Sequence, residues 1–249
     1  MISVSNLVKI YPGNCTALDG VSFKIERGEV CGYLGANGAG KTTTVKILTG
    51  MLSADNGEAS INGIDIIKAP QKVKQIVGYV PESGAVFQSL TPYEFLEFVC
   101  KIYSMVPAVY RKRIQDFLEL FDLADEMNVP MASFSKGMKQ KVLIISSLIH
   151  NPEVIFWDEP LSGLDYNTAV LVRDLIKELS ANGKTFFYCS HVLDVVEKTC
   201  SRIIIIKSGR VVFDEKLKPG DNSFSLEDVY KKYIDADSKK EKVSNLFKP

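Results

Sequence analysis

The stretch Gly35-Ala36-Asn37-Gly38-Ala39-Gly40-Lys41-Thr42 decides the fold, because it fits the pattern G-x-x-x-x-G-K-[ST]. Residues 29–34 precede it and are expected to form a buried strand, and a helix is expected from about residue 41 to 48. Glycines let backbone N–H groups approach a phosphate closely, and a helix N-terminus adds partial positive charge. The stretch therefore predicts a strand, loop and helix that bind a nucleoside triphosphate.

Two side chains of this loop have predicted roles of their own. Lys41 is expected to reach the β- and γ-phosphates, and the hydroxyl of Thr42 is expected to ligate Mg²⁺. The alternative is a glycine-rich turn with an exposed lysine. The candidate nucleotide-binding residues of the loop are Gly35, Ala36, Asn37, Gly38, Ala39, Gly40, Lys41, Thr42 and Thr43.

A second group of candidate site residues follows a short apolar segment. Residues 154–157 are all apolar and precede Asp158 and Glu159. A buried strand that ends in an aspartate would place a carboxylate where Mg²⁺ needs an oxygen ligand. Glu159 would then polarise an attacking water. The alternative is an ordinary loop that opens with Asp-Glu-Pro after a strand.

The pattern of apolar and polar residues along the chain predicts an α/β fold with a parallel sheet, an N-terminal antiparallel β part and a helical insert. Residues 21–25 alternate between apolar and polar, and Asn62-Gly63 between apolar residues is a strong hairpin signal. Residues 84–151 have mostly helical patterns, and strands and helices alternate after them. We expect an ATP-binding core of residues 1–83 and 152–215, a helical subdomain of residues 84–151, and a C-terminal helix and tail of residues 216–249.

Composition excludes few classes of protein but indicates the cellular location and the kinds of partner to expect. The chain has 249 residues, 46% of them hydrophobic, and 30 basic residues balance 30 acidic ones, so no nucleic-acid partner is expected. Five cysteines without a CxxC pair predict reduced thiols. The first residues lack a signal-peptide pattern, and no apolar run approaches the ~20 residues of a membrane span. We therefore expect a cytoplasmic protein that does not cross the membrane by itself.

The order of further motifs resembles the ATP-binding cassette family over roughly residues 1–215. The most specific one is Phe134-Ser135-Lys136-Gly137-Met138, between the glycine-rich loop and the acidic pair, which is similar to the family signature Leu-Ser-Gly-Gly-Gln. Lys136 and Met138 depart from the commonest form, whereas Ser135 and Gly137 are retained. The resemblance implies that these two contact a γ-phosphate held by the opposite subunit. The alternative is an ordinary helix that Ser135 caps.

Four more positions resemble family motifs. Asp165, at the end of Ser162-Gly163-Leu164-Asp165, resembles the aspartate loop that crosses a dimer interface, although a plain helix cap is also compatible. His191 resembles the switch histidine that contacts the γ-phosphate, and Tyr11 resembles the aromatic residue that stacks on adenine. Glu82 stands where the family usually has glutamine, and a carboxylate there is a suitable Mg²⁺ ligand.

The resemblance implies a mechanism and partners. Two ATP-binding subunits, identical or different, would pack head to tail and hold two ATP molecules with Mg²⁺ between them. Hydrolysis at Glu159 would let the dimer open and drive an integral membrane transporter subunit on a separate chain. The aromatic-rich segment 85–98 would contact that subunit on the cytoplasmic face of the membrane; the alternative is that its aromatic side chains only pack the core of the helical insert. The departures in the signature and at Glu82 favour an export-type system.

Two other classes of protein remain as alternatives. A non-transport cassette ATPase of translation or DNA repair would show two cassettes or long coiled coils, and the sequence has one glycine-rich loop and no long heptad run. A GTPase would be expected to carry Asn-Lys-x-Asp, which does not occur. The sequence does not identify the transported substrate or the partner half of the dimer.

Overall fold

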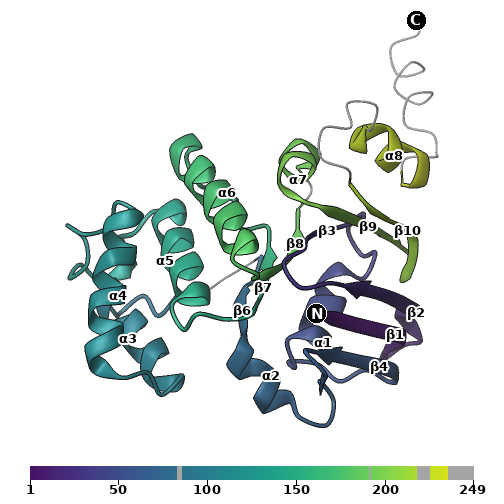
Figure 1. Ribbon diagram of the computed structural model, residues 1–249, viewed down its shortest axis with the longest axis horizontal. Helices are drawn as coiled ribbons and strands as arrows, with labels where there is room; N and C mark the ends of the chain where they lie inside the picture. Colours follow the sequence, from purple (N-terminus) through teal and green to yellow (C-terminus); the bar gives the residue numbers. More distant parts are fainter. Residues whose placement is uncertain (83–85, 191, 218–224, 235–249) are drawn as a thin grey trace, which may run out of the picture.

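The computed structural model describes residues 1–82, 86–190, 192–217 and 225–234, and it contains two sheets (Figure 1). The core sheet has the strand order β10-β9-β3-β8-β7-β6, and all its pairings are parallel except that of β10 with β9. Its strands are β3 (Val30–Leu34), β6 (Val77–Val80), β7 (Val154–Asp158), β8 (Thr185–Cys189), β9 (Arg202–Lys207) and β10 (Arg210–Lys216).

The second sheet is antiparallel and comes from the N-terminal part of the chain. Its order is β2-β1-β4-β5, and its strands are β1 (Ile2–Tyr11), β2 (Cys15–Ile25), β4 (Asn56–Ile61) and β5 (Ile64–Asp65). Asn62 and Gly63 both adopt positive φ between β4 and β5, as a tight hairpin turn requires. The hairpin predicted there is therefore confirmed.

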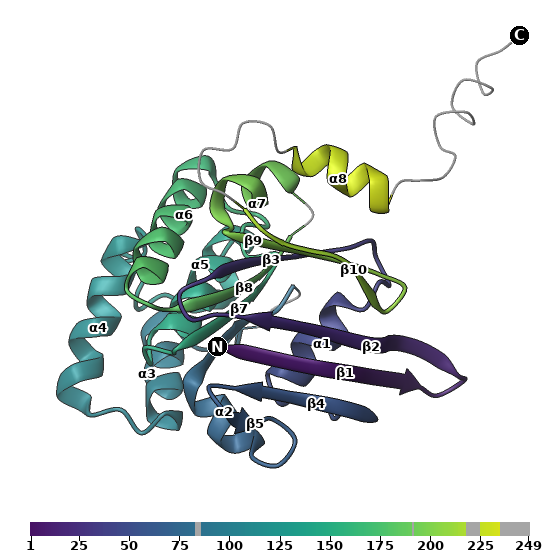
Figure 2. The ribbon, with the colours of Figure 1, turned by 45° about the vertical axis from the view of Figure 1, so that its right-hand side comes forward.

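The helices divide between the two faces of the core sheet. α1 (Lys41–Leu48) lies between the two sheets, whereas α3, α4 and α5 gather on the other side of the molecule, with α6 beside them (Figures 1 and 2). The helices are α1, α2 (Pro70–Ile76), α3 (Pro92–Ile102), α4 (Pro107–Leu120), the 3-10 turn η1 (Met131–Ser133), α5 (Lys136–Leu148), α6 (Tyr166–Ala181), α7 (Leu193–Thr199) and α8 (Leu226–Tyr233).

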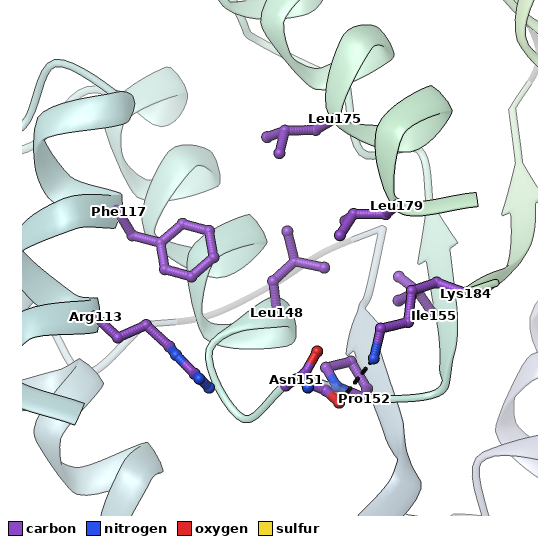
Figure 3. A pocket seen from close by; sticks show the side chains of 9 residues that line it. All are labelled: Arg113, Phe117, Leu148, Asn151, Pro152, Ile155, Leu175, Leu179 and Lys184. Atoms are coloured by element: carbon purple, nitrogen blue, oxygen red, sulfur yellow. Dashed lines mark hydrogen bonds between the residues drawn. The ribbon is translucent and has the colours of Figure 1, made fainter. Parts of the chain in front are cut away.

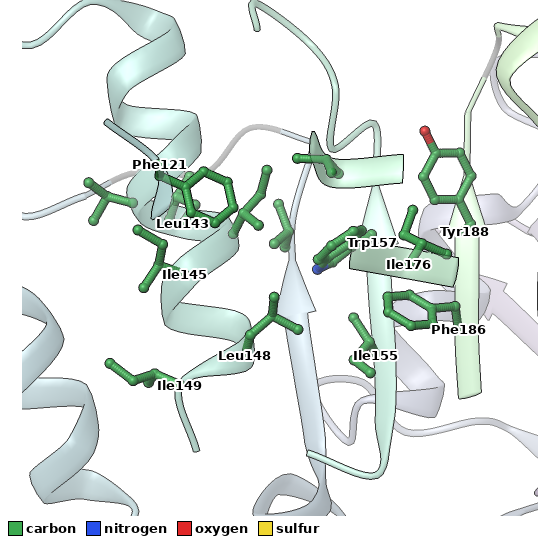
Figure 4. Close-up of a cluster of buried hydrophobic side chains, with 14 of the residues drawn as sticks. Phe121, Leu143, Ile145, Leu148, Ile149, Ile155, Trp157, Ile176, Phe186 and Tyr188 are labelled. Atoms are coloured by element: carbon green, nitrogen blue, oxygen red, sulfur yellow. The ribbon is translucent and has the colours of Figure 1, made fainter. Parts of the chain in front are cut away.

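Both faces of the core sheet are buried, which explains its nearly continuous apolar strands. On β7, Ile155 and Trp157 pack toward α5 and α6, while Val154 and Phe156 pack toward the N-terminal sheet and α1. Figure 4 shows the first of these clusters, in which Trp157 lies among side chains of α5, α6 and β8. The indole N–H of Trp157 donates a 2.9 Å hydrogen bond to Ser147 Oγ, so one buried polar contact fixes α5 on the sheet.

The α/β fold class is confirmed, and most local signals are borne out. At the start of α3, Thr91 and Glu94 form a reciprocal capping box and Pro92 occupies the first helical position. α4 begins at Pro107, which occupies its first turn. α3, α4, η1 and α5 all lie within residues 84–151, and the division into domains stays a prediction. Its boundary at residue 84 falls outside the described residues.

A helix that crosses a bilayer needs about 20 predominantly apolar residues. Within the described ranges, no helix is both long and apolar enough to cross a membrane.

Candidate nucleotide site

The glycine-rich loop connects the end of β3 to the start of α1, as predicted. Gly40 is the residue before α1 and has φ 112°, and a Cβ there would come 2.6 Å from the carbonyl oxygen of Ala17 on β2. Only glycine fits this position. Among the described residues no side chain caps α1, so its first backbone N–H groups point toward the loop without a side-chain acceptor. Such an end is suited to an anion.

The side chain of Lys41 is folded back over this loop. Its ammonium group donates to the carbonyl oxygens of Gly35 at 2.6 Å and Ala36 at 3.1 Å. An ammonium group has three donors, so one remains for a ligand. Lys41 therefore lies where an incoming phosphate would meet a positive charge held by the loop itself.

A cavity of about 730 Å³ opens in front of the loop. That volume lies within the range of small-molecule sites. Three parts of the chain line it: the β1–β2 hairpin, the loop with α1, and the carboxyl ends of β6 and β7. The lining residues are Tyr11, Cys15, Thr16, Ala17, Asn37, Gly38, Gly40, Lys41, Thr42, Thr43, Glu82, Asp158 and Glu159.

Asp158 ends β7 beside the loop and is only 2% exposed. The Thr42 hydroxyl donates to Asp158 Oδ2 over 3.4 Å. The pKa of Asp158 is raised to about 6, first by burial and then by the carboxylates of Glu82 and Glu159, while Lys41 and Thr42 act in the opposite direction. Three carboxylates thus repel one another next to a hydroxyl, which is the donor chemistry that Mg²⁺ prefers.

Glu159 follows in an uncommon backbone conformation. Its φ is 52°, in the left-handed region, and its N–H donates to the carbonyl oxygen of Cys189 on β8 at 2.9 Å. The hydroxyl of Ser190 donates to Glu159 Oε2 at 3.2 Å. The backbone bond and the serine together orient the carboxylate toward the cavity. Ser190 was not among the residues expected in the site, because only the folded sheet places the ends of β7 and β8 together.

Tyr11 lies at the end of β1, on the rim of the cavity. It pairs with Cys15 across the β1–β2 turn, and its hydroxyl is 3.4 Å from Thr43 Oγ1. Cys15, Thr16 and Ala17 line the cavity, although sequence motifs did not indicate them. Their signal was the turn at Pro12-Gly13-Asn14, which brings the start of β2 back beside Tyr11.

Ser135 and Gly137 lie elsewhere, at the first turn of α5. Ser135 Oγ accepts a hydrogen bond from the Met138 N–H at 3.2 Å, so it caps the helix. A Cβ on Gly137 would come 2.6 Å from the carbonyl oxygen of Gly163, so the position requires glycine. Neither residue lines the cavity of its own chain.

Of the predicted site residues Asp165 and His191, the structure describes only Asp165. Asp165 caps α6, where it accepts bonds from the Thr168 N–H at 2.9 Å and the Thr168 hydroxyl at 2.6 Å. The hydroxyl bond, with the backbone bond second, lowers the pKa of Asp165. The structure thus shows the helix-cap role for Asp165, and any contact across a dimer interface stays a prediction. His191 lies outside the described residues.

The sequence of most of the chain is similar to those of known proteins. The sequence model of the family described as "ABC transporter" matches residues 18–162. The chain is 37% identical over 215 residues to the ABC transporter ATP-binding protein NatA of Bacillus subtilis, covering 86% of this chain and 87% of NatA. It is 36% identical to the linearmycin resistance ATP-binding protein LnrL of the same organism, covering 85% of this chain and 68% of LnrL.

A solved structure shows the same fold. The dimeric post-hydrolysis state of the ATP-binding cassette MJ0796, bound to ADP and Pi, superposes with a TM-score of 0.81 at 28% identity, covering 88% of this chain and 99% of that one. The strand–loop–helix unit, the buried acidic strand end and the matches over most of the chain lead to one conclusion. This protein belongs to the ABC transporter ATP-binding protein family and is an ATPase.

Proposed function

We propose that this chain binds ATP with Mg²⁺ in the 730 Å³ cavity, forms a dimer with a second ATP-binding subunit and powers export through a separate membrane subunit. The observation that carries the proposal is the composition of the cavity. It joins a phosphate-binding loop, a carboxylate cluster and an aromatic ring at the carboxyl ends of parallel strands, where ligands bind in open α/β sheets.

The lining of the cavity offers a partner to each end of ATP. The part of the loop from Asn37 to Thr43 provides most of the phosphate-facing lining, so its backbone N–H groups would surround the phosphates, and Lys41 adds its remaining N–H donor. Tyr11, at the end of β1 on the rim of the cavity, stacks on the adenine ring. Stacking explains why Tyr11 needs no hydrogen bond to the base, and its hydroxyl contact with Thr43 holds the ring beside the loop.

Mg²⁺ suits the oxygen groups of Thr42, Asp158 and Glu82. Among the described residues, no group of three or more His, Cys, Asp or Glu side chains could hold a metal ion alone, so phosphate oxygens complete the ligand set. Bound Mg²⁺ supplies positive charge that offsets the negative charge of the phosphates. At this site its charge would also offset the repulsion from Glu82 and Glu159, which after burial raises the pKa of Asp158.

Glu159 acts as the general base that orients the attacking water. Ser190 and the backbone bond to Cys189 hold its carboxylate at the edge of the cavity next to Asp158. His191, directly after Ser190 in the chain, is proposed to contact the γ-phosphate by family resemblance.

The site is completed by a second subunit. Ser135 and Gly137 open α5 at a distance from their own cavity, so their helix N-terminus is available to the γ-phosphate of a facing subunit. Asp165, which caps α6 near that interface, belongs to the same face. The dimeric state of the solved relative supports this arrangement.

A second cavity supports the membrane partner. It has a volume of about 470 Å³ and lies between α2 and α3, where Met51 is 57% and Ile102 57% exposed. Phe87 and Phe98 are exposed on the same helical part and contact each other edge to face. We propose that a short amphipathic helix of the transporter subunit docks here, at the cytoplasmic face of the membrane. The name of LnrL, a resistance protein, supports export.

The catalytic part is tested with Glu159→Gln. The variant is expected to keep ATP affinity and to lose turnover by about 10²- to 10⁴-fold, because glutamine cannot accept the proton. Glu215→Gln, on the exposed side of β10, is the matched control and should hydrolyse ATP normally. Turnover of Glu159→Gln within a few-fold of the parent would refute the base assignment.

The partner is tested by recovering the tagged chain from native membranes in mild detergent. A multi-span protein in fixed stoichiometry is expected, and Met51→Glu with Ile102→Glu should abolish its recovery. Leu120→Glu alters an exposed apolar side chain outside the 470 Å³ cavity and should leave recovery intact. Recovery only with ribosomal or DNA-bound proteins would favour a non-transport ATPase.

A further inference from the structure

A third cavity lies on the core sheet away from the nucleotide site, with a volume of about 270 Å³. Ile155 of β7 lines it, whereas the nucleotide cavity begins at Asp158, at the other end of the same strand. We call it the Arg113–Lys184 cavity. Its lining residues, all drawn in Figure 3, are Arg113, Phe117, Leu148, Asn151, Pro152, Ile155, Leu175, Leu179 and Lys184.

The body of this cavity is apolar. Phe117 comes from α4, Leu148 from the end of α5, and Leu175 and Leu179 from α6, and all four point into one space (Figure 3). An apolar surface of this kind favours the binding of an apolar group, because that removes apolar area from water. A hydrocarbon chain in this space would touch α4, α5 and α6 at once.

Two cations stand at the rim, from different elements. Arg113 Nη1 donates to the carbonyl oxygen of Ile149 at 2.8 Å, and Lys184 Nζ donates to that of Asn151 at 3.2 Å. Figure 3 shows them on either side of the Asn151–Pro152 turn. Each bond uses one donor, and a guanidinium has five and an ammonium three. After these two hydrogen bonds, Arg113 and Lys184 therefore still have several N–H groups that can bind a ligand.

The charge at this rim is not neutralised by an ion pair. Across the part of the chain that the structure describes, neither Arg113 nor Lys184 has a carboxylate within salt-bridge distance. Burial lowers the pKa of Lys184, the Glu153 carboxylate acts against this, and the charges of Arg27 and then Arg113 lower it further. Glu153 accepts a 2.6 Å hydrogen bond from Asn62 Nδ2 and keeps its charge, but it forms no ion pair with Lys184 in the described part of the chain, so the two cations still repel each other. A bound anion would relieve this repulsion.

We propose that the Arg113–Lys184 cavity binds a small amphipathic carboxylate, with its hydrocarbon chain among Phe117, Leu175 and Leu179 and its carboxylate between the two cations. The volume is close to the lower limit for ligand sites, which restricts the ligand to a short chain. Such a ligand would hold α4 and α5 against α6 and β7. The inference does not depend on the nucleotide chemistry.

The protein contains its own reporter for this site. Trp157 is the only tryptophan of the chain, is fully buried, and lies on the same face of β7 as Ile155, two residues away (Figure 4). The purified, nucleotide-free protein would be titrated with octanoate while Trp157 fluorescence is recorded. Calorimetry on the same samples detects binding if the indole signal does not change. Saturation with a dissociation constant of ~1 mM or lower is expected.

Two probes separate the contributions of charge and chain. Octan-1-ol keeps the chain without the carboxylate, and acetate keeps the carboxylate without the chain. Both are expected to bind at least about tenfold more weakly than octanoate, since charge-assisted hydrogen bonds and apolar burial are both required. Octan-1-ol that binds as tightly as octanoate would overturn the proposal.

Variants locate the site. Lys184→Met keeps the methylene chain and should weaken octanoate binding at least about tenfold, and Lys177→Met, on the exposed side of α6, should not. Leu175→Phe fills the cavity and should block binding even if Lys184→Met fails to fold. Absence of saturable octanoate binding to the parent, or unchanged binding by both Lys184→Met and Leu175→Phe, would refute the inference.

Discussion

The ammonium group of Lys136 donates a 2.9 Å hydrogen bond to Ser162 Oγ. The methylenes of the same side chain pack on Gly163, where a Cβ would come 3.2 Å from Lys136 Cδ. Lys136 is the residue that replaces glycine in the signature motif of the family. It therefore links the first turn of α5 to the loop that follows Glu159.

Lys136→Ala is predicted to slow ATP turnover by about two- to tenfold, the effect of one lost hydrogen bond, with little change in ATP affinity. The reason is that Lys136 lies outside the nucleotide cavity of its own chain and acts on the position of the loop. Steady-state ATPase kinetics measure the effect. Lys136→Arg should restore part of the rate and Lys139→Ala should leave it unchanged; a large loss of ATP affinity would show that Lys136 binds nucleotide directly.

Ser135→Arg is predicted to abolish hydrolysis while ATP binding to the isolated monomer stays nearly intact. The bulky cation would obstruct the start of α5, which is not part of the cavity that binds ATP in the same chain. Nucleotide binding at low protein concentration and ATPase activity at high concentration separate the two effects. Loss of ATP affinity in the monomer would contradict the arrangement in which each ATP is shared between subunits.

Asp158→Asn is predicted to stabilise the nucleotide-free protein at neutral pH. Because the pKa of Asp158 is raised from 3.8 to about 6, the folded state binds this proton more tightly than the unfolded state. The free energy of unfolding therefore falls as pH rises from about 4 to about 6, and the loss persists above pH 6. The variant should gain roughly 1–3 kcal/mol at pH 7.5 and much less at pH 4.

Urea denaturation at the two pH values tests this prediction. Asp174→Asn, on the exposed side of α6, is the control and should shift neither curve. Equal stabilisation by Asp158→Asn at both pH values would show that the effect is not the titration of this carboxylate. The same variant should lose Mg²⁺-dependent turnover.

Ser147→Ala is predicted to destabilise the fold by about 1–3 kcal/mol, because it leaves the buried N–H of Trp157 without its acceptor. Ser180→Ala is a matched control, since the hydroxyls of Ser147 and Ser180 both donate to the carbonyl oxygen three residues earlier in their helices. Thermal or urea unfolding gives the comparison. A loss no larger than that of Ser180→Ala would contradict the role of this bond.

Features encoded by a few adjacent residues could be predicted from the sequence. The glycine-rich loop, the capping box at Thr91 and the Asn62-Gly63 turn each depend on backbone conformations that only certain residues adopt. The apolar run before Asp158 predicted a buried strand for the same local reason. The fold class followed from the order of these signals.

Other features depend on tertiary structure and have weak local signals. Alternation along β1 is interrupted where Asn6 adopts positive φ and the register with β2 shifts, so the strand lacks a clean period of two. α2 and α7 have seven residues each, fewer than two full helical turns, so an apolar periodicity hardly shows in their sequences. The contacts of Lys136 with Ser162 and of Ser190 with Glu159 join residues 26 and 31 positions apart and arise only from the packing of α5, β7 and β8.

The left-handed backbone of Glu159 has a further consequence. A side chain at φ 52° is less stable there than glycine would be, by an amount on the order of 1 kcal/mol. Selection for a durable fold alone would favour glycine or asparagine at this position. The chain carries a glutamate in spite of that cost. Engineering for thermal tolerance would therefore favour replacing Glu159 at an early stage, and the replacement would remove ATP hydrolysis.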